Sequence, residues 1–62
     1  MIILRKYKGD INEEWFEVSK EEFLDDTEGG GAWKEGTALE TLEEFGKLWT
    51  NFCLYKQGNK ND

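Results

Sequence analysis

The sequence predicts an α+β domain with a small three-stranded antiparallel or mixed sheet and two short helices on one face, in the order β-β-α-α-β. Three observations lead to it. Residues 48–55 (LWTNFCLY) are the longest uncharged run of bulky side chains. Residues 2–8 are rich in β-branched and aromatic side chains and stop at a glycine. Helix-capping sequences begin at Ser19 and Thr37. The alternative is a small all-β SH3-like barrel in which residues 32–42 form a strand paired with the last one.

The chain has 62 residues, enough for one domain over residues 1–56, and we expect residues 57–62 to be a disordered polar tail. A domain of this size buries only about 60% of its unfolded surface. One cysteine and no histidine exclude an internal disulfide and an ordinary zinc site. The core therefore depends on the nine aromatic residues, each of which removes roughly 150–250 Å² from water when buried.

The first two strands are predicted over residues 2–8 and 14–18, joined by a turn at residues 9–12 as an antiparallel hairpin. The first strand carries Arg5, Lys6 and Lys8. Such a charged strand suits the edge of a sheet or a strand with one face in solvent.

The first helix is predicted to start at Ser19, whose hydroxyl can accept from the Glu22 amide, and to end near Asp26 or Thr27. A glycine-containing loop over residues 28–31 follows it. The second helix is predicted to start at Thr37 by the same device and to stop at Gly46. Its apolar stripe comprises Ala38, Leu39, Leu42 and Phe45.

The run at residues 48–55 is predicted to be one continuous central strand, covered on both faces. With a period of two, Trp49, Cys53 and Tyr55 point to the face opposite the helices. The side chains that we expect in the core are Phe16, Phe23, Phe45, Phe52, Leu39, Leu42 and Leu54.

The sequence argues against an enzyme and against a cofactor. Without histidine, neither a Ser-His-Asp triad nor a Cys-His pair can form. Ser19 is more useful as a helix cap, and Cys53 lies in the run that we expect to be buried. Residues 28–37 lack the spacing of a phosphate-binding loop, and residues 25–36 lack that of a calcium loop, so weak Mg²⁺ or Ca²⁺ association is the most that we expect.

The charge is unevenly distributed along the chain. Residues 10–44 carry thirteen carboxylates and two lysines, a net charge of −11, while the segments before and after them carry +3 and +2. Like charges four residues apart cost a helix about 0.2–0.5 kcal/mol per pair. The sequence nevertheless contains the pairs Glu21/Asp25, Glu22/Asp26 and Glu40/Glu44. Acidic helix faces that tolerate this repulsion suggest a surface that binds a basic protein.

We therefore expect a small acidic, non-enzymatic protein-interaction or regulatory protein. The partner-binding candidates are Glu21, Glu22, Asp25, Asp26, Trp33, Glu40, Glu43 and Glu44. A sharper hypothesis is an inhibitor that mimics nucleic-acid phosphate charge, as small phage or mobile-element proteins do. The opposing interpretation is that the acidic faces are only solvated. Trp33 either covers the core or anchors an interface. Direct nucleic-acid binding is disfavoured because the cations are too few.

The second hypothesis is a structural or homo-oligomerising subunit that dimerises through Trp49, Cys53 and Tyr55. A lone cysteine in a buried-looking strand fits a reducing compartment, so we expect a cytoplasmic protein. The opening residues 1–4 are too short for a signal peptide or membrane span, and no membrane association is expected.

Overall fold

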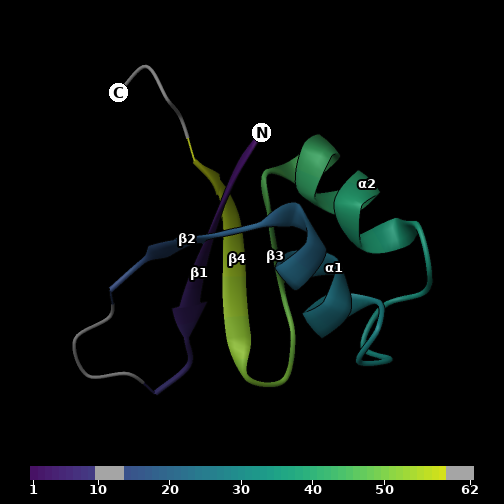
Figure 1. Cartoon of the computed structure of the whole chain (residues 1–62), viewed down its shortest axis with the longest axis horizontal. Helices are drawn as coiled ribbons and strands as arrows, with labels where there is room; N and C mark the ends of the chain where they lie inside the picture. The colour runs from purple at the N-terminus through teal and green to yellow at the C-terminus, as the bar shows by residue number, and fades with distance from the viewer. Residues whose placement is uncertain (10–13, 59–62) are drawn as a thin grey trace.

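The computed structural model describes residues 1–9 and 14–58 and has the predicted α+β class. Its elements are β1 (Ile2–Tyr7), β2 (Phe16–Val18), α1 (Lys20–Thr27), α2 (Thr37–Phe45), β3 (Lys47–Trp49) and β4 (Cys53–Gly58). The strands form one antiparallel sheet in the order β2-β1-β4-β3, and both helices pack on the same face (Figure 1). The barrel alternative is wrong because residues 37–45 are helical.

The single central strand predicted over residues 48–55 is also wrong, because this segment is a β-hairpin. The backbone N–H of Thr50 donates to the carbonyl of Cys53 at 2.8 Å. The hydroxyl of Thr50 accepts from the N–H of Phe52 at 3.3 Å and of Cys53 at 3.0 Å. A threonine side chain therefore makes the turn, and the sheet has four strands where the sequence predicts three.

The hairpin reverses which residues share a face of the sheet. Directly paired residues on antiparallel strands point to the same side. Leu48 pairs with Tyr55, and both lie under the helices, whereas Trp49 pairs with Leu54 on the opposite face. Odd positions of β3 thus share a face with even positions of β4, which a continuous strand does not allow. We call the uncovered side of the sheet the open face.

The core lies between the helices and the sheet. Its buried apolar members are Ile3, Val18, Phe23, Ala38, Leu42, Leu48, Cys53 and Tyr55. At its centre the rings of Phe23 and Tyr55 meet edge to face, with centroids 4.9 Å apart. Burial of Phe23 and Leu42 is confirmed, and Leu39 and Leu54 are half-buried.

Three of the predicted core aromatics are wrong. Phe16, Phe45 and Phe52 are 41%, 68% and 74% exposed. Phe52 lies in the hairpin turn and Phe45 is the last residue of α2, so each lies where an element ends. Phe16 packs against Tyr7, with ring centroids 5.6 Å apart.

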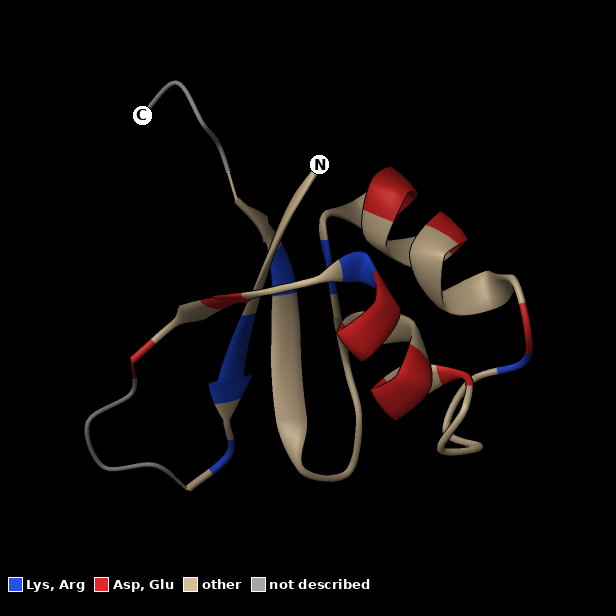
Figure 2. Ribbon diagram, in the orientation of Figure 1, with Lys and Arg blue, Asp and Glu red and all other residues tan. Residues whose placement is uncertain are grey.

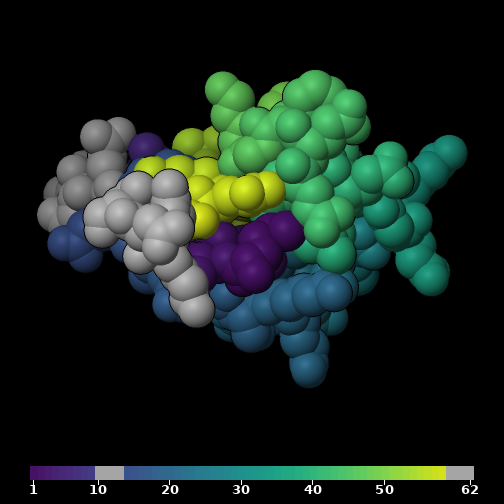
Figure 3. Space-filling model, turned by 90° about the horizontal axis from the view of Figure 1, so that it is seen from above, coloured from purple at the N-terminus to yellow at the C-terminus, as the bar shows by residue number. Residues whose placement is uncertain are grey.

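The strand β1 is interior to the sheet, so of the two alternatives for its charged residues, an edge strand or a strand with one face in solvent, the edge strand is wrong. The strand β1 lies between β2 and β4, and it pairs with β4 from Ile2 to Tyr7. Seen from above, the purple start of the chain lies beside the yellow end of β4 (Figure 3). Arg5 faces the helices and is 7% exposed. Its guanidinium carbon lies 5.3–5.9 Å from the ring centroids of Tyr7, Phe16 and Tyr55.

The start of α1 is as predicted, since the Ser19 hydroxyl accepts from the Glu22 N–H at 3.0 Å. Beyond its end, the glycine-containing loop folds back over the last turn. The N–H groups of Ala32 and Trp33 both donate to the Thr27 carbonyl at 3.1 Å. This return brings Trp33 against the core.

The start of α2 differs from the prediction. Thr37 is the first helical residue, and its hydroxyl donates to the Lys34 carbonyl at 2.6 Å instead of capping the helix. The capping oxygen comes from Glu28, whose carboxylate accepts from the Ala38 N–H at 3.1 Å. The predicted stop is confirmed, because Gly46 has φ = 79° and donates to the Leu42 carbonyl.

The strand β4 continues through Gln57 and Gly58, which the sequence assigns to the polar tail. The Gln57 N–H donates to the Gly46 carbonyl at 2.9 Å, and its side-chain amide donates to the Leu42 carbonyl at 2.7 Å. The rest of the predicted tail, residues 59–62, lies outside the described residues. No helix in the described ranges is long and apolar enough to cross a membrane.

Candidate functional site

Positive and negative charge occupy different layers of the molecule. Most lysine and arginine residues lie on the strands, and most aspartate and glutamate residues lie on the helices and the loop between them (Figure 2). Exceptions include Lys20, at the start of α1, Lys34, on the loop between the helices, Glu17, on β2, and Glu14, just before β2. The helix layer is therefore the acidic side of the protein.

Within this layer, α1 and the loop that follows it surround an open hollow of about 660 Å³. Its lining residues are Ser19, Glu21, Glu22, Leu24, Asp25, Glu28, Gly29 and Glu35. Glu21, Asp25 and Glu28 are four and three residues apart, so they project from one side of α1 and its end. We call this site the acidic hollow.

The sequence predicted three of the five carboxylates of the acidic hollow, namely Glu21, Glu22 and Asp25, and missed the other two. Glu28 lies seven residues after Glu21, and this spacing could have added it to the same side. No local pattern could have found Glu35, because the loop over residues 29–36 brings it back beside α1.

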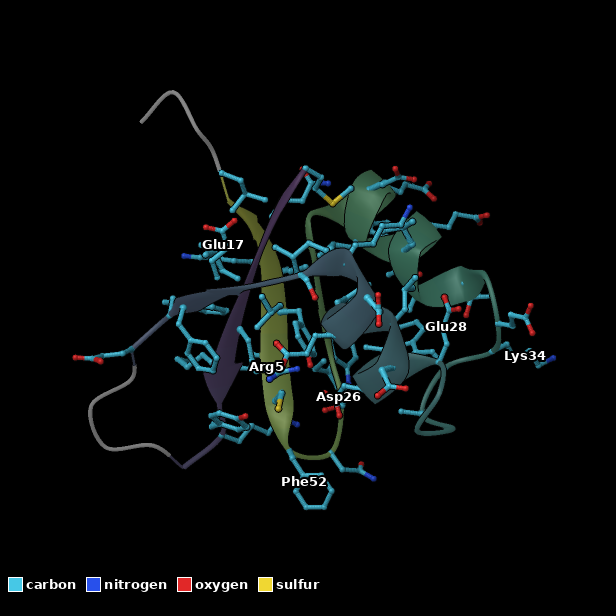
Figure 4. The ribbon with its side chains drawn as sticks, in the orientation of Figure 1. Arg5, Glu17, Asp26, Glu28, Lys34 and Phe52 are labelled. Atoms are coloured by element: carbon cyan, nitrogen blue, oxygen red, sulfur yellow. The ribbon has the colours of Figure 1, made fainter. Side chains whose placement is uncertain are left out.

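The carboxylates of the acidic hollow lack cationic partners, with one exception. Glu22 lies 3.8 Å from the guanidinium of Arg5. Among residues 1–9 and 14–58, no lysine or arginine lies within ion-pairing distance of Glu21, Asp25 or Glu35. Lys34 is exposed and extends away from Glu28 at the edge of the molecule (Figure 4).

The chemistry of the acidic hollow suits cationic side chains better than a bound metal ion. In the part of the chain that the structure describes, no three metal-ligating side chains are arranged to hold an ion. Half-buried Leu24 adds an apolar patch between the carboxylates. Separate carboxylates around an apolar patch can receive a lysine or arginine, whose aliphatic stem packs while its charged end is paired.

The predicted partner-binding residue Asp26 is engaged within the fold. Its carboxylate accepts a hydrogen bond from the hydroxyl of Tyr55. The same hydroxyl accepts from Nε of Arg5 at 2.9 Å, so Arg5 and Asp26 meet between the sheet and α1 (Figure 4). Burial and the hydrogen bond to Asp26 both raise the pKa of Tyr55. Asp26 therefore links α1 to the sheet through its hydrogen bond with Tyr55.

Trp33 covers the outer edge of the sheet. Its indole N–H donates to the carbonyl of Trp49 at 2.9 Å, and the two indole rings lie at 77° with centroids 6.4 Å apart. The side chain is half-buried against the core. These contacts favour the interpretation in which Trp33 covers the core over the one in which it anchors an interface.

The other predicted candidates lie apart from the acidic hollow. Glu40, Glu43 and Glu44 are exposed on α2. The predicted dimer face is split by the hairpin: Trp49 is 59% exposed, whereas Cys53 and Tyr55 are 3% and 1% exposed beneath the helices. The prediction that these three side chains share one exposed face is wrong.

Cys53 is the one cysteine of the sequence, and it is buried. Burial, followed by the charge of Asp26, raises the pKa of the Cys53 thiol, so this thiol stays protonated near neutral pH.

Comparisons of the chain with protein-family models, with curated proteins and with solved structures find no match. The function is therefore argued from the geometry of the chain itself.

Proposed function

We propose that this chain is a non-enzymatic protein-interaction protein whose acidic hollow binds a basic segment of a partner protein. The observation that carries the proposal is the grouping of Glu21, Asp25 and Glu35 around one hollow without a cation from the described part of the chain. Carboxylates that repel one another in the free protein gain most when a partner supplies the missing charge.

The arrangement of the neighbouring carboxylates supports this choice of surface. Asp26 is hydrogen-bonded to Tyr55, Glu22 lies near Arg5, and Glu28 caps α2. These three contribute to the fold, whereas Glu21, Asp25 and Glu35 make no such contact with residues 1–9 or 14–58. The division leaves a set of acidic residues that can be changed without disturbing the contacts that hold the fold.

The non-enzymatic part of the proposal depends on the available side chains. The sequence has no histidine, and the buried Cys53 thiol has a raised pKa. Ser19 is engaged as the cap of α1. General acid–base or nucleophilic catalysis of the usual kinds needs an activated group that these residues do not supply.

The experiment compares two variants that lose the same number of charges. The E21Q/D25N/E35Q variant neutralises the acidic hollow, and the E40Q/E43Q/E44Q variant neutralises the exposed side of α2. Each raises the formal net charge from −6 to −3. Wild type and both variants are immobilised and used to capture proteins from a lysate, with bound proteins eluted by increasing salt and measured by mass spectrometry.

We expect a captured partner that carries a basic patch, elutes as salt rises, is lost from the hollow variant and is kept by the α2 variant. Equal retention by both variants, or retention by the hollow variant alone, would contradict the proposal. Mimicry of nucleic-acid phosphate is its narrower form. It predicts that duplex DNA displaces the partner from the wild-type protein and that an uncharged polymer, as the control, does not. If only the uncharged polymer displaces the partner, the mimicry hypothesis is ruled out.

A further inference from the structure

The open face of the sheet carries a second surface of opposite character. A shallow groove of about 360 Å³ lies there, and its lining includes Trp15, Trp49, Leu54, Lys47 and Lys56. Trp49 and Leu54 are directly paired on β3 and β4, and Lys47 and Lys56, two residues further along each strand, form the next pair on the same face. We call this site the tryptophan groove. It is apolar at its centre and cationic at one end.

The lysine pair is the unusual feature of the tryptophan groove. Like charges directly opposite each other on neighbouring strands destabilise a sheet. Among the described residues, no carboxylate lies within ion-pairing distance of Lys47 or Lys56. The Lys56 ammonium lies 4.4 Å from the ring centroid of Trp15, a cation–π contact that leaves its positive charge uncompensated.

The apolar part is equally unusual for a chain with such a small core. Trp49 is 59% exposed, although a core of this size depends on burying its aromatic side chains. Trp15 and Leu54 are half-buried and line the same groove. Exposed aromatic side chains are enriched at the centre of protein-binding surfaces, and polar side chains form the rim around them.

We propose that the tryptophan groove binds an acidic polypeptide segment that inserts one bulky apolar side chain against Trp15, Trp49 and Leu54. Carboxylates next to that side chain pair with Lys47 and Lys56. An anion placed there removes the repulsion of the lysine pair, so binding relieves a cost that the free sheet carries. This surface and its partner are independent of the acidic hollow.

Charge complementarity decides against the other occupants. A two-fold dimer whose axis passes near the lysine pair brings like charges together. A single nucleic-acid strand needs a cationic track along its backbone, whereas the lining of this groove supplies a single pair of lysines. The segment is also not added as a fifth strand beside β3, because the Trp49 carbonyl at that edge already accepts from Trp33.

The test uses a defined probe and a pair of matched variants. The probe is a fluorescein-labelled peptide with one phenylalanine between two pairs of glutamates, and the readout is fluorescence anisotropy. The K47E/K56E variant reverses the charge of the groove. The K20E/K34E variant makes the same change of charge at two exposed lysines outside it. The E21Q/D25N/E35Q variant separates the groove from the acidic hollow.

We expect K47E/K56E to weaken binding of the peptide by about tenfold or more, while K20E/K34E changes it by less than about threefold. Replacing the phenylalanine of the peptide by glycine is expected to weaken binding by a similar factor. The hollow variant is expected to bind at least as tightly as wild type. In NMR spectra, the peptide is expected to shift the indole N–H signals of Trp15 and Trp49.

Several results would overturn the inference. No binding at millimolar peptide, or equal weakening by the two lysine variants, would show that the groove does not recognise this chemistry. Tighter binding of an oligothymidylate than of the peptide would assign the groove to nucleic acid. Self-association in sedimentation velocity that K47E/K56E abolishes and K20E/K34E preserves would show that the occupant is a second copy of the chain.

Discussion

The phenol of Tyr55 donates a hydrogen bond to the carboxylate of Asp26 and accepts one from Arg5. This places a strand residue, a helix carboxylate and a buried guanidinium in one network beneath α1. Glu22, one turn before Asp26, lies 3.8 Å from the same guanidinium. The Glu22/Asp26 pair therefore faces a buried cation, and the repulsion inferred from its spacing is compensated there.

Removing the Tyr55 hydroxyl tests this network. Tyr55→Phe leaves the ring in the core but deprives both Asp26 and Arg5 of a partner in a largely buried place. We expect it to lower the free energy of unfolding by about 1–3 kcal/mol, measured by urea denaturation. Tyr7→Phe is the control, since the Tyr7 hydroxyl accepts a longer bond of 3.3 Å from Arg5 at a 45% exposed side chain. Equal losses in the two variants would contradict the network.

Alkaline pH is expected to destabilise the protein. Burial and the hydrogen bond to Asp26 raise the pKa of folded Tyr55 above the value of about 10 in an unfolded chain. The unfolded state then loses its proton at lower pH than the folded state, so stability is kept below pH 10 and lost as pH rises beyond it. The raised pKa of Cys53 acts in the same direction from about pH 9.

The measurement is the melting temperature between pH 7 and 12, compared with that of Tyr55→Phe. The variant is expected to lose less stability than wild type above about pH 10 because it lacks the ionisable hydroxyl. Parallel pH profiles for the two proteins would show that Tyr55 does not contribute.

The carboxylate of Glu28 is expected to stabilise the start of α2. Glu28→Ala removes the acceptor of the Ala38 N–H and is expected to cost about 0.5–2 kcal/mol, as loss of a helix cap does. Hydrogen exchange at Ala38 is expected to accelerate with it. Glu35→Ala, on the same loop but without such a bond, is the control. If both variants unfold at the same urea concentration, Glu28 is not the cap.

Neutralising the Asp25 carboxylate is expected to stabilise the fold, although this residue belongs to the proposed binding site. This residue lies near the carbonyl end of α1 and one turn after Glu21, so both the helix dipole and its neighbour disfavour its charge. Asp25→Asn is expected to raise the free energy of unfolding by about 0.2–0.5 kcal/mol at low salt. Glu21→Gln is the control, because it relieves the same repulsion but gives up a favourable charge in the first turn. A loss of stability in Asp25→Asn would contradict this balance.

Local chemistry made the helices predictable. The Ser19 hydroxyl and the positive φ of Gly46 act within one turn of their own positions, so the sequence around them contains what is needed. The hairpin turn at Thr50 lacks an asparagine–glycine signal and depends on hydrogen bonds to a side chain, so the sequence pattern alone indicates one strand. The interior position of β1 depends on its pairing with β4, about fifty residues away.

The same limit applies to the candidate site. Glu21 and Asp25 follow from helical spacing, but the roles of Asp26 and Glu28 depend on partners from β4 and α2. The tryptophan groove could not be predicted at all, because it requires the reversal of sidedness within the hairpin. Once Trp49 is paired with Leu54, the exposed indole and the two lysines fall on one face.

The accessibility of thiols tests this sidedness most directly. Cys53 is the one cysteine of the sequence and is 3% exposed beneath the helices, whereas Trp49 is 59% exposed. With a thiol reagent under native conditions, we predict that wild-type Cys53 reacts only as fast as the protein unfolds and that a W49C/C53S variant reacts nearly as fast as a free thiol. Rapid modification of Cys53 in the folded protein, at a rate equal to that of W49C/C53S, would contradict the two-sided sheet and the tryptophan groove that depends on it.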